Sequence, residues 1–267
     1  MGSFQEEKGM LAIERQEQIV SQIRRNGAVR IHELTKQFGV SVETIRRDLL
    51  ELERQDCLHR VHGGAVGIAV AKQYHRLEER TEENPQKKEE LSGYAAGLIR
   101  ESDVLMVDSG STAIAFAKML AEEFERLTVI TYSLHVFEIL KKKEGFTLYL
   151  CAGAYLRDEN AFCGQWALQM LEQFHAKTAF LFPSAISLQN GIMDYDQELY
   201  HLQRAMMKHA DRSVFLADSD KFEKSALLKL ADVNEAVTFV TDSGLRKEIL
   251  ELYQENGIEM IRGEQKQ

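Results

Sequence analysis

The feature that most constrains this chain of 267 residues is a regular alternation of short apolar runs and amphipathic segments over residues 87–261. The apolar runs have the length of buried strands, and the segments between them show the 3.6-residue period of helices. Strands that alternate with helices are typical of a parallel sheet covered by helices. The sequence therefore predicts a mostly parallel α/β domain. The predicted strands are residues 103–107, 127–131, 147–152, 178–182, 213–218, 236–241 and 258–261.

The first 66 residues follow a different pattern, that of three short helices. Residues 10–26 predict one helix, and residues 31–38 predict a second one that ends at Gly39. Ser41 then caps a third helix that runs to Arg54. The predicted buried stripe of this third helix consists of Val42, Ile45, Leu49 and Leu52.

A helix, a glycine-bearing turn and a second helix present the first turns of the second helix to the major groove of DNA. Arginine offers paired donors to guanine edges and phosphates, and hydroxyl groups suit phosphate oxygens. Residues 58–66 add a small ribbon that turns at Gly63–Gly64. In an isolated helix, surface arginines would indicate only a solvated face, but three helices, a glycine turn and a ribbon in this order favour DNA binding. The candidate DNA-binding residues are Ser41, Thr44, Arg46, Arg47, Arg60 and His62.

The charge distribution supports a division of the chain. Residues 10–66 hold nine Lys or Arg against eight Asp or Glu, whereas the rest of the chain holds 24 against 34. The net charge of −9 thus belongs to the second part, and a DNA reader needs only one basic face because phosphate neutralisation is local. The charged, poorly patterned residues 67–86 predict a linker. We therefore expect a DNA-binding domain over 1–66, a linker over 67–86 and an effector-sensing domain over 87–267.

Polar side chains follow three predicted strands of the second domain. Ligands of open α/β sheets collect outside the carboxyl ends of the strands. Main-chain N–H groups at a helix start attract phosphate, and glycine lets an anion approach the backbone. Hydroxyl groups and a lysine at neighbouring strand ends complete a site for a small phosphorylated metabolite. The candidate effector-binding residues are Asp108, Ser109, Gly110, Ser111, Thr112, Thr131, Ser133 and Lys221.

Several other functions are not favoured by the sequence. No apolar stretch reaches the length of a membrane span, and the first residues do not form a secretory signal. The three cysteines lie far apart without a Cys-x-x-Cys pair, and the histidines lack ligand spacing, which indicates a cytoplasmic protein without metal or cofactor. A sugar-phosphate isomerase with an appended DNA-binding domain is the main alternative, but residues 182–187 hold no carboxylate for proton transfer. A protein-interaction module built on the helix-turn-helix is a third reading.

Residues 40–66, VSVETIRRDLLELERQDCLHRVHGGAV, resemble the winged helix-turn-helix signature of the DeoR family of transcription repressors. The resemblance implies that Thr44, Arg46 and Arg47 enter the groove and that the wing around residues 60–64 supports them. Residues 87–261 resemble the sensor domain of the same family, which is similar in fold to ribose-5-phosphate isomerase. The family's Asp-x-Gly-x-Thr loop is present as Asp108–Thr112, and its Asp-Ser-x-Lys-Phe stretch as Asp218–Phe222.

The sensor domain also departs from the family pattern. The common Thr-Asn-Ser stretch has Tyr132 in its centre, and the Gly-Gly after the third strand is Ala152–Gly153. The Gly-x-x-Gly-Ile-Ser loop reads Phe182–Ser187, and Leu199 stands at the usual position of a glutamate, although Glu198 is adjacent. Because Tyr132 and Phe182 are bulky, they narrow the pocket, and a non-sugar or differently shaped effector stays open.

Together these patterns predict a winged helix-turn-helix domain followed by a Rossmann-like sensor domain. The expected protein is a transcription regulator of carbohydrate or related metabolism, a repressor in the first instance. The expected partners are double-stranded operator DNA, a small phosphorylated metabolite and further copies of the chain in a dimer or tetramer.

Overall fold

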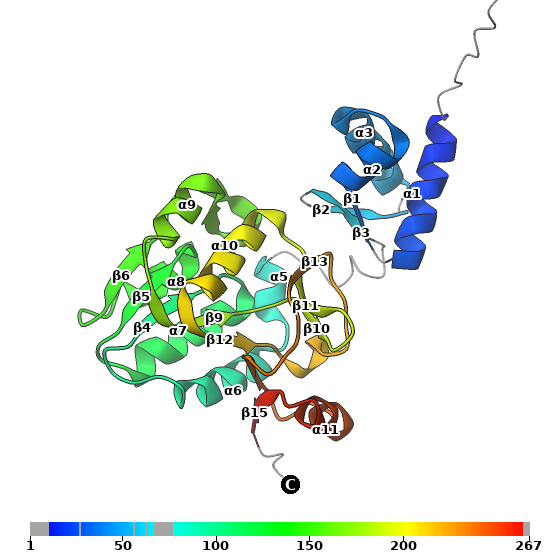
Figure 1. The fold of residues 1–267 in the computed structure, drawn as a ribbon. Helices are drawn as coiled ribbons and strands as arrows, with labels where there is room; N and C mark the ends of the chain where they lie inside the picture. Colours follow the sequence, from blue (N-terminus) through cyan, green and yellow to red (C-terminus); the bar gives the residue numbers. More distant parts are fainter. Residues whose placement is uncertain (1–10, 27, 56, 62, 67–76, 264–267) are drawn as a thin grey trace, which may run out of the picture. The chain divides into compact units, whose positions relative to one another are not determined.

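The computed structural model describes residues 11–26, 28–55, 57–61, 63–66 and 77–263 (Figure 1). The chain divides into two compact units, residues 1–74 and residues 75–267. Among the described residues, no helix is long and apolar enough to cross a membrane.

The first unit is a winged helix-turn-helix, as predicted. Strand β3 (Gly64–Val66) pairs antiparallel with both β1 (Ala28–Arg30) and β2 (His59–Val61), which gives a three-stranded ribbon. Gly64 lies so close to β1 that a Cβ there would be 2.1 Å from the Val29 carbonyl oxygen, so only glycine fits. Leu34, Ile45 and Leu49 are buried in the core. The elements are α1 (Ala12–Asn26), β1 (Ala28–Arg30), α2 (Ile31–Phe38), α3 (Val42–Arg54), β2 (His59–Val61) and β3 (Gly64–Val66).

The turn between α2 and α3 forms as its residues require. Gly39 adopts the left-handed conformation with φ 64°, which ends α2. The Ser41 side chain accepts a hydrogen bond from the Thr44 N–H at 3.1 Å and caps α3. The prediction that Val42 is buried was wrong, because its side chain is 46% exposed. Val42 is the first residue of α3 and lies at the rim of the buried face, whose centre is occupied by Ile45, Asp48 and Leu52.

The second unit is built on a sheet of seven parallel strands in the order β15-β14-β12-β9-β4-β5-β6, which confirms the predicted α/β fold. The strands are β4 (Val104–Val107), β5 (Thr128–Thr131), β6 (Thr147–Leu150), β9 (Ala176–Leu181), β12 (Ala210–Leu216), β14 (Val237–Thr241) and β15 (Glu259–Arg262). The helices are α5 (Leu77–Glu82), α6 (Pro85–Ala96), α7 (Ser111–Glu123), α8 (Leu134–Leu140), α9 (Gly164–Leu171), α10 (Gln197–Lys208) and α11 (Lys247–Glu255).

Helices cover both faces of this sheet, and the alternation of side chains along the strands builds two cores. On one face Leu105 and Val107 of β4 pack with α6, α7 and α8. On the other face Met106 of the same strand belongs to the core formed with α9, α10 and α11. Nearly continuous apolar strands are expected where both faces of a parallel sheet are buried.

Short antiparallel strands that the sequence patterns did not predict lie near the sheet. β7 (Ala154–Leu156) pairs with β8 (Ala161–Cys163), and a short 3₁₀ turn at Arg157–Glu159 joins them. A separate three-stranded sheet has the order β10-β11-β13, with β10 (Ala185–Ser187), β11 (Gly191–Asp194) and β13 (Leu228–Ala231).

The predicted linker contains structure of its own. Residues 67–76 lie outside the described residues, but residues 77–86 form α5 and the start of α6. Helix α5 packs on α7, within the second unit. The sequence prediction missed α5 because a six-residue helix carries too few apolar positions to show a period.

Candidate functional site

The first turn of α3 presents a polar surface. Arg46 and Arg47 are exposed. Arg46 lies 3.9 Å from Glu43, and a surface ion pair of this kind contributes little to stability. Val42 is exposed in the same turn, and its apolar side chain is of a kind that can pack against the methyl group of thymine. Both arginine guanidinium groups are thus available to a partner.

The other predicted DNA-binding residues differ in their surroundings. The hydroxyl groups of Ser41 and Thr44 lie 2.9 Å apart, and Ser41 also caps the helix, so its oxygen already has a structural task. Arg60 is exposed on β2 and lies 4.0 Å from Glu53, whose carboxylate also accepts the Arg60 N–H at 2.7 Å. His62 lies outside the described residues.

A buried ion pair, which the sequence analysis did not predict, joins α3 to α1. Arg15 of α1 donates from Nε to Asp48 Oδ2 at 2.5 Å and from a terminal nitrogen to Oδ1 at 3.1 Å. Gln16 adds a third donor at 3.2 Å. Both ion-pair side chains are less than a tenth exposed. The pair holds α1 against α3, and Arg47 lines the groove between these two helices.

The second polar site lies at the switch point of the seven-stranded sheet. The chain runs outward from β4 to β5 and β6 on one side, and it continues through β9 on the other. Adjacent loops then leave in opposite directions at the carboxyl ends of β4 and β9, the place where open α/β sheets bind their ligands. The predicted loop Asp108–Thr112 follows β4, and residues 182–184 follow β9.

The start of α7 lacks an internal cap. Gly110 is the N-cap residue with φ 113°, its conformation is favourable only for glycine, and no side chain caps the helix there. The first N–H groups of any helix have no acceptor within the helix. The Thr112 hydroxyl oxygen is buried and has no hydrogen-bond partner among the described residues. Nothing lies within 4 Å of the position of a Gly110 Cβ. These features suit a bound anion.

Asp108, by contrast, is fully enclosed by the protein. Its Oδ1 accepts hydrogen bonds from the Ser109 N–H at 2.7 Å and from the Tyr132 hydroxyl. Its Oδ2 accepts from the Phe182 N–H and from Gln203 Nε2, both at 3.2 Å. Burial raises the pKa of Asp108 to about 6, although the bond from Tyr132 acts in the opposite direction.

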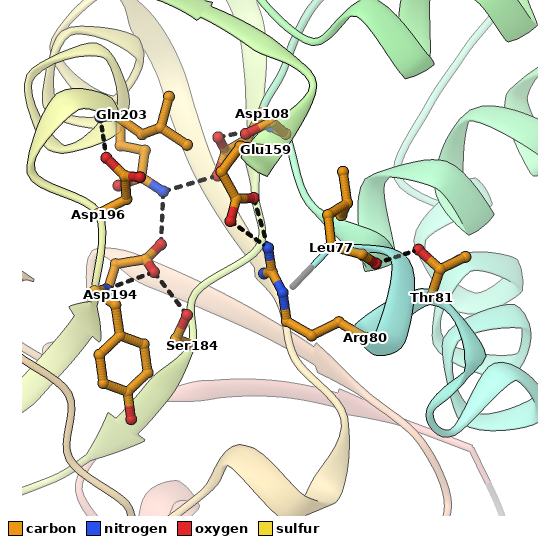
Figure 2. A network of polar contacts seen from close by, with 12 residues as sticks. Leu77, Arg80, Thr81, Asp108, Glu159, Ser184, Asp194, Asp196 and Gln203 are labelled. Atoms are coloured by element: carbon orange, nitrogen blue, oxygen red, sulfur yellow. Dashed lines mark hydrogen bonds and ion pairs between the residues drawn. The ribbon is translucent and has the colours of Figure 1, made fainter. Parts of the chain in front are cut away.

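Gln203 carries this network across to the β10-β11-β13 sheet. Its Nε2 also donates to Asp194 Oδ2 at 2.8 Å, and Asp194 accepts from the Ser184 hydroxyl at 2.6 Å (Figure 2). The neighbouring Asp196 caps α10, and burial raises its pKa to about 6. The ends of β4, β9 and β11 are therefore held together by one chain of hydrogen bonds.

The predicted residues that follow the flanking strands have different surroundings. Thr131 and Ser133 are buried, and each accepts a main-chain hydrogen bond, Thr131 from the Ser133 N–H and Ser133 from the Val136 N–H. Lys221 donates to the Pro183 carbonyl at 3.1 Å, which places its ammonium group at the end of β9.

Lys88 is a cation that sequence reasoning missed. Its side chain is 4% exposed and donates to the carbonyls of Arg80 and Glu83, at the end of α5 and just beyond it. Burial and then the charge of Lys221 lower the pKa of Lys88 to about 8. The one indication of its role in the sequence is that it lies on the apolar face of a predicted helix. A lysine is seldom buried unless it has a partner. Lys88 also lines, with Ser111 of the loop, a groove of about 340 Å³ between α5, α6 and α7.

Helix α5 is attached by an ion pair as well. Arg80 makes two contacts of 2.5 Å with the Glu159 carboxylate, which is 5% exposed and lies between β7 and β8 (Figure 2). Residues next to Glu159 contact the start of α8, since the Asn160 carbonyl accepts the Leu134 N–H and Ala161 bridges to Ser133. Thus α5 is connected, through Glu159, to the segment that follows β5.

The comparisons with known proteins agree with the two units. Residues 15–69 match the model of the DeoR-like helix-turn-helix domain, and residues 83–243 match that of the DeoR C terminal sensor domain. The transcriptional repressor AccR of Agrobacterium fabrum is 35% identical over 87% of this chain and 90% of its own. The L-fucose operon activator of Haemophilus influenzae is 31% identical over 86% of this chain and 92% of its own.

Among solved structures, ribose 5-phosphate isomerase A of Methanocaldococcus jannaschii is 17% identical, with a TM-score of 0.39 over 52% of this chain and 55% of its own, too slight a likeness for argument. The relatives in sequence are regulators rather than enzymes. The chain therefore belongs to the DeoR family and is a DNA-binding transcription regulator.

Proposed function

We propose that this regulator represses genes of carbohydrate or related metabolism and that a small phosphorylated metabolite at the β4–α7 loop controls its binding to DNA. Repression is supported by the likeness to AccR, and a sugar-related role by the likeness to the L-fucose operon activator. Like other regulators that read paired half-sites, the protein acts as a dimer or tetramer.

The uncapped start of α7 carries the proposal for the effector. The main-chain N–H groups after Gly110, together with the hydroxyl groups of Ser111 and Thr112, supply the donors that a phosphate requires. The ammonium group of Lys221 lies close enough to that of Lys88 for its charge to lower the pKa of Lys88. An anion between or beside them would remove this repulsion, and a doubly charged phosphate does so better than a carboxylate.

Lys88 also connects the proposed site to the start of the sensor unit. Its Nζ donates to the Arg80 and Glu83 carbonyls. A phosphate near Ser111 would compete for the same ammonium group. We infer that effector binding weakens the hold on α5, the first described helix of the sensor unit. The resulting change in DNA affinity can be no larger than the difference between the effector's affinities for the DNA-binding state and the released state.

On the DNA side, Arg46 and Arg47 are the proposed contacts to base edges or phosphates, with Thr44 and Arg60 beside them. Ser41 serves mainly as the cap that orients these side chains. His62 stays a prediction of the wing. The net charge near zero of residues 10–66 makes individual arginines important, since no broad basic field is present to replace them.

The test is a thermal-shift screen of phosphorylated sugars and polyols with the full chain, followed by DNA binding in the presence of the hits. Thr112→Val removes the unpartnered hydroxyl with little change in shape, and Lys221→Ala removes one charge. Both variants should lose at least tenfold in affinity for the phosphate esters and keep their affinity for DNA. Unchanged phosphate affinity in both variants would show that the β4–α7 loop is not the effector site.

A further inference from the structure

The carboxylate of Asp108 has no room for a further hydrogen-bond donor. A carboxylate offers about four lone-pair positions, and Ser109, Tyr132, Phe182 and Gln203 provide one donor each. Asp108 is 0% exposed. An effector hydroxyl that bonded to Asp108 would first have to displace one of these four groups.

Three of the four donors are fixed by the fold itself. Two are main-chain N–H groups, of Ser109 in the loop and of Phe182 at the end of β9, and Gln203 is held from its other side by Asp194. The fourth donor is the Tyr132 hydroxyl. It comes from the side chain at which this sequence departs from the Thr-Asn-Ser pattern.

Tyr132 is rigidly held in this arrangement. Its side chain is 0% exposed and packs in the core with Met106 and Ile130. Its hydroxyl contacts both the Asp108 carboxylate and the Ser109 side chain. The ring thereby ties the first two residues of the anion-binding loop to the protein and leaves only the following residues, Gly110–Thr112, for a ligand.

We propose that Tyr132 is a specificity-determining residue that closes Asp108 to effector hydroxyl groups. The inference rests on the proposed phosphate site. The effector of this chain is then a compound held by its phosphate at Gly110–Thr112 without a hydroxyl bound to Asp108. Asp108 acts as a positioning residue that anchors the loop, rather than as the effector ligand that the sequence predicted.

A matched pair of phosphate esters tests this directly on the full chain. Propyl phosphate and glycerol 3-phosphate share a three-carbon body and a phosphate, and they differ by two hydroxyl groups. The wild type should bind both with affinities within about threefold of each other in isothermal titration. Tyr132→Asn, which removes the ring, should shift the preference toward glycerol 3-phosphate by about tenfold, the value of one hydrogen bond to a carboxylate. Tyr132→Phe, which removes only the hydroxyl donor, should shift the preference in the same direction by about threefold to fivefold, because one acceptor position of Asp108 becomes free while the ring stays in place.

The outcomes separate the two proposals. A wild type that prefers glycerol 3-phosphate tenfold or more would overturn the role of Tyr132 and leave the phosphate site intact. A Tyr132→Asn variant that stays folded and keeps the wild-type preference would do the same. If Tyr132→Asn does not fold, Tyr132→Phe decides alone, because an unchanged preference in this variant would overturn the role of the Tyr132 hydroxyl. No binding of either ester, or of inorganic phosphate, would overturn both proposals.

Discussion

Arg15 and Asp48 form a buried ion pair, with the guanidinium Nε 2.5 Å from a carboxylate oxygen, and this pair joins α1 to α3, the helix proposed to read DNA. Removal of one partner leaves a buried charge without compensation, which costs about 3–5 kcal/mol. We predict that Arg15→Ala or Asp48→Ala destabilises the first unit by this amount.

Hydrogen exchange of the full chain is the measurement, because it reports on each unit separately. Exchange in peptides from α1 and α3 should accelerate at least a hundredfold in both variants, and the sheet of the second unit should not change. The double variant Arg15→Met with Asp48→Leu should recover most of the protection, since apolar residues of similar size often replace a buried pair without loss. Equal protection in Asp48→Ala and wild type would show that the pair contributes nothing.

The pH dependence of stability should carry a contribution from Asp196. Its pKa is raised by burial from 3.8 to about 6 in the folded chain. Between these values the folded state holds a proton that the unfolded state releases. This contribution to stability is therefore present at low pH and is lost as pH rises through about 6, by about 3 kcal/mol in all.

Asp196→Asn removes the charge and keeps an acceptor for the Glu198 and Leu199 N–H groups, which Asp196 caps at 2.7 and 3.2 Å. Calorimetric melting of the variant should match the wild type near pH 4 and exceed it at pH 7. Asp196→Ala, the control that loses the cap, should be less stable than Asp196→Asn at every pH. A difference between Asn variant and wild type that does not change with pH would contradict the raised pKa.

The attachment of α5 should depend on Glu159. Glu159→Gln weakens the paired contacts with Arg80 and leaves the rest of the turn in place. We predict that amide exchange in residues 77–82 accelerates about tenfold or more, as for the loss of a partly buried ion pair. Asp158→Asn is the matched control, because Asp158 is the exposed neighbour in the same turn. Similar exchange in the two variants would exclude Arg80–Glu159 as the attachment.

Lys88 and Lys87 provide a second matched comparison. Lys88 is buried beside the proposed site, whereas Lys87 is paired with Asp220 at 2.8 Å on the surface. Lys88→Met should reduce the affinity for inorganic phosphate at least tenfold, and Lys87→Met should change it less than threefold. Titration calorimetry at constant ionic strength makes the comparison, and equal effects of the two substitutions would remove Lys88 from the site.

The sequence was sufficient for the elements whose signal lies in their own residues. The helix-turn-helix follows from Gly39, Ser41 and the apolar spacing of α3, and the sheet follows from strands that are apolar on both faces. The failures have a physical reason too. Val42 satisfies the helical period, but it is the first residue of its helix and its side chain stays 46% exposed.

The candidate site was predictable only in part. Loop Asp108–Thr112 could be found because a strand, a glycine and hydroxyl residues follow one another in the sequence. The ion pairs Arg15–Asp48 and Arg80–Glu159 join residues 33 and 79 positions apart, and no local pattern predicts such a contact. The enclosure of Asp108 likewise depends on Tyr132 and Gln203, which only the folded chain brings to it.

In the proposed mechanism, one chain reads DNA through α3 and senses a phosphate ester through the β4–α7 loop. The most direct measurement is fluorescence anisotropy with a duplex selected by the wild type from random sequence, with and without the best ester from the screen. Arg47→Ala should weaken DNA binding at least tenfold at fixed salt and still bind the ester, with Arg54→Ala as an unaffected control. Thr112→Val should bind DNA as the wild type does and no longer respond to the ester. A variant that loses both DNA binding and ester binding would contradict this mechanism. So would a result in which Arg47→Ala and Thr112→Val both behave as the wild type.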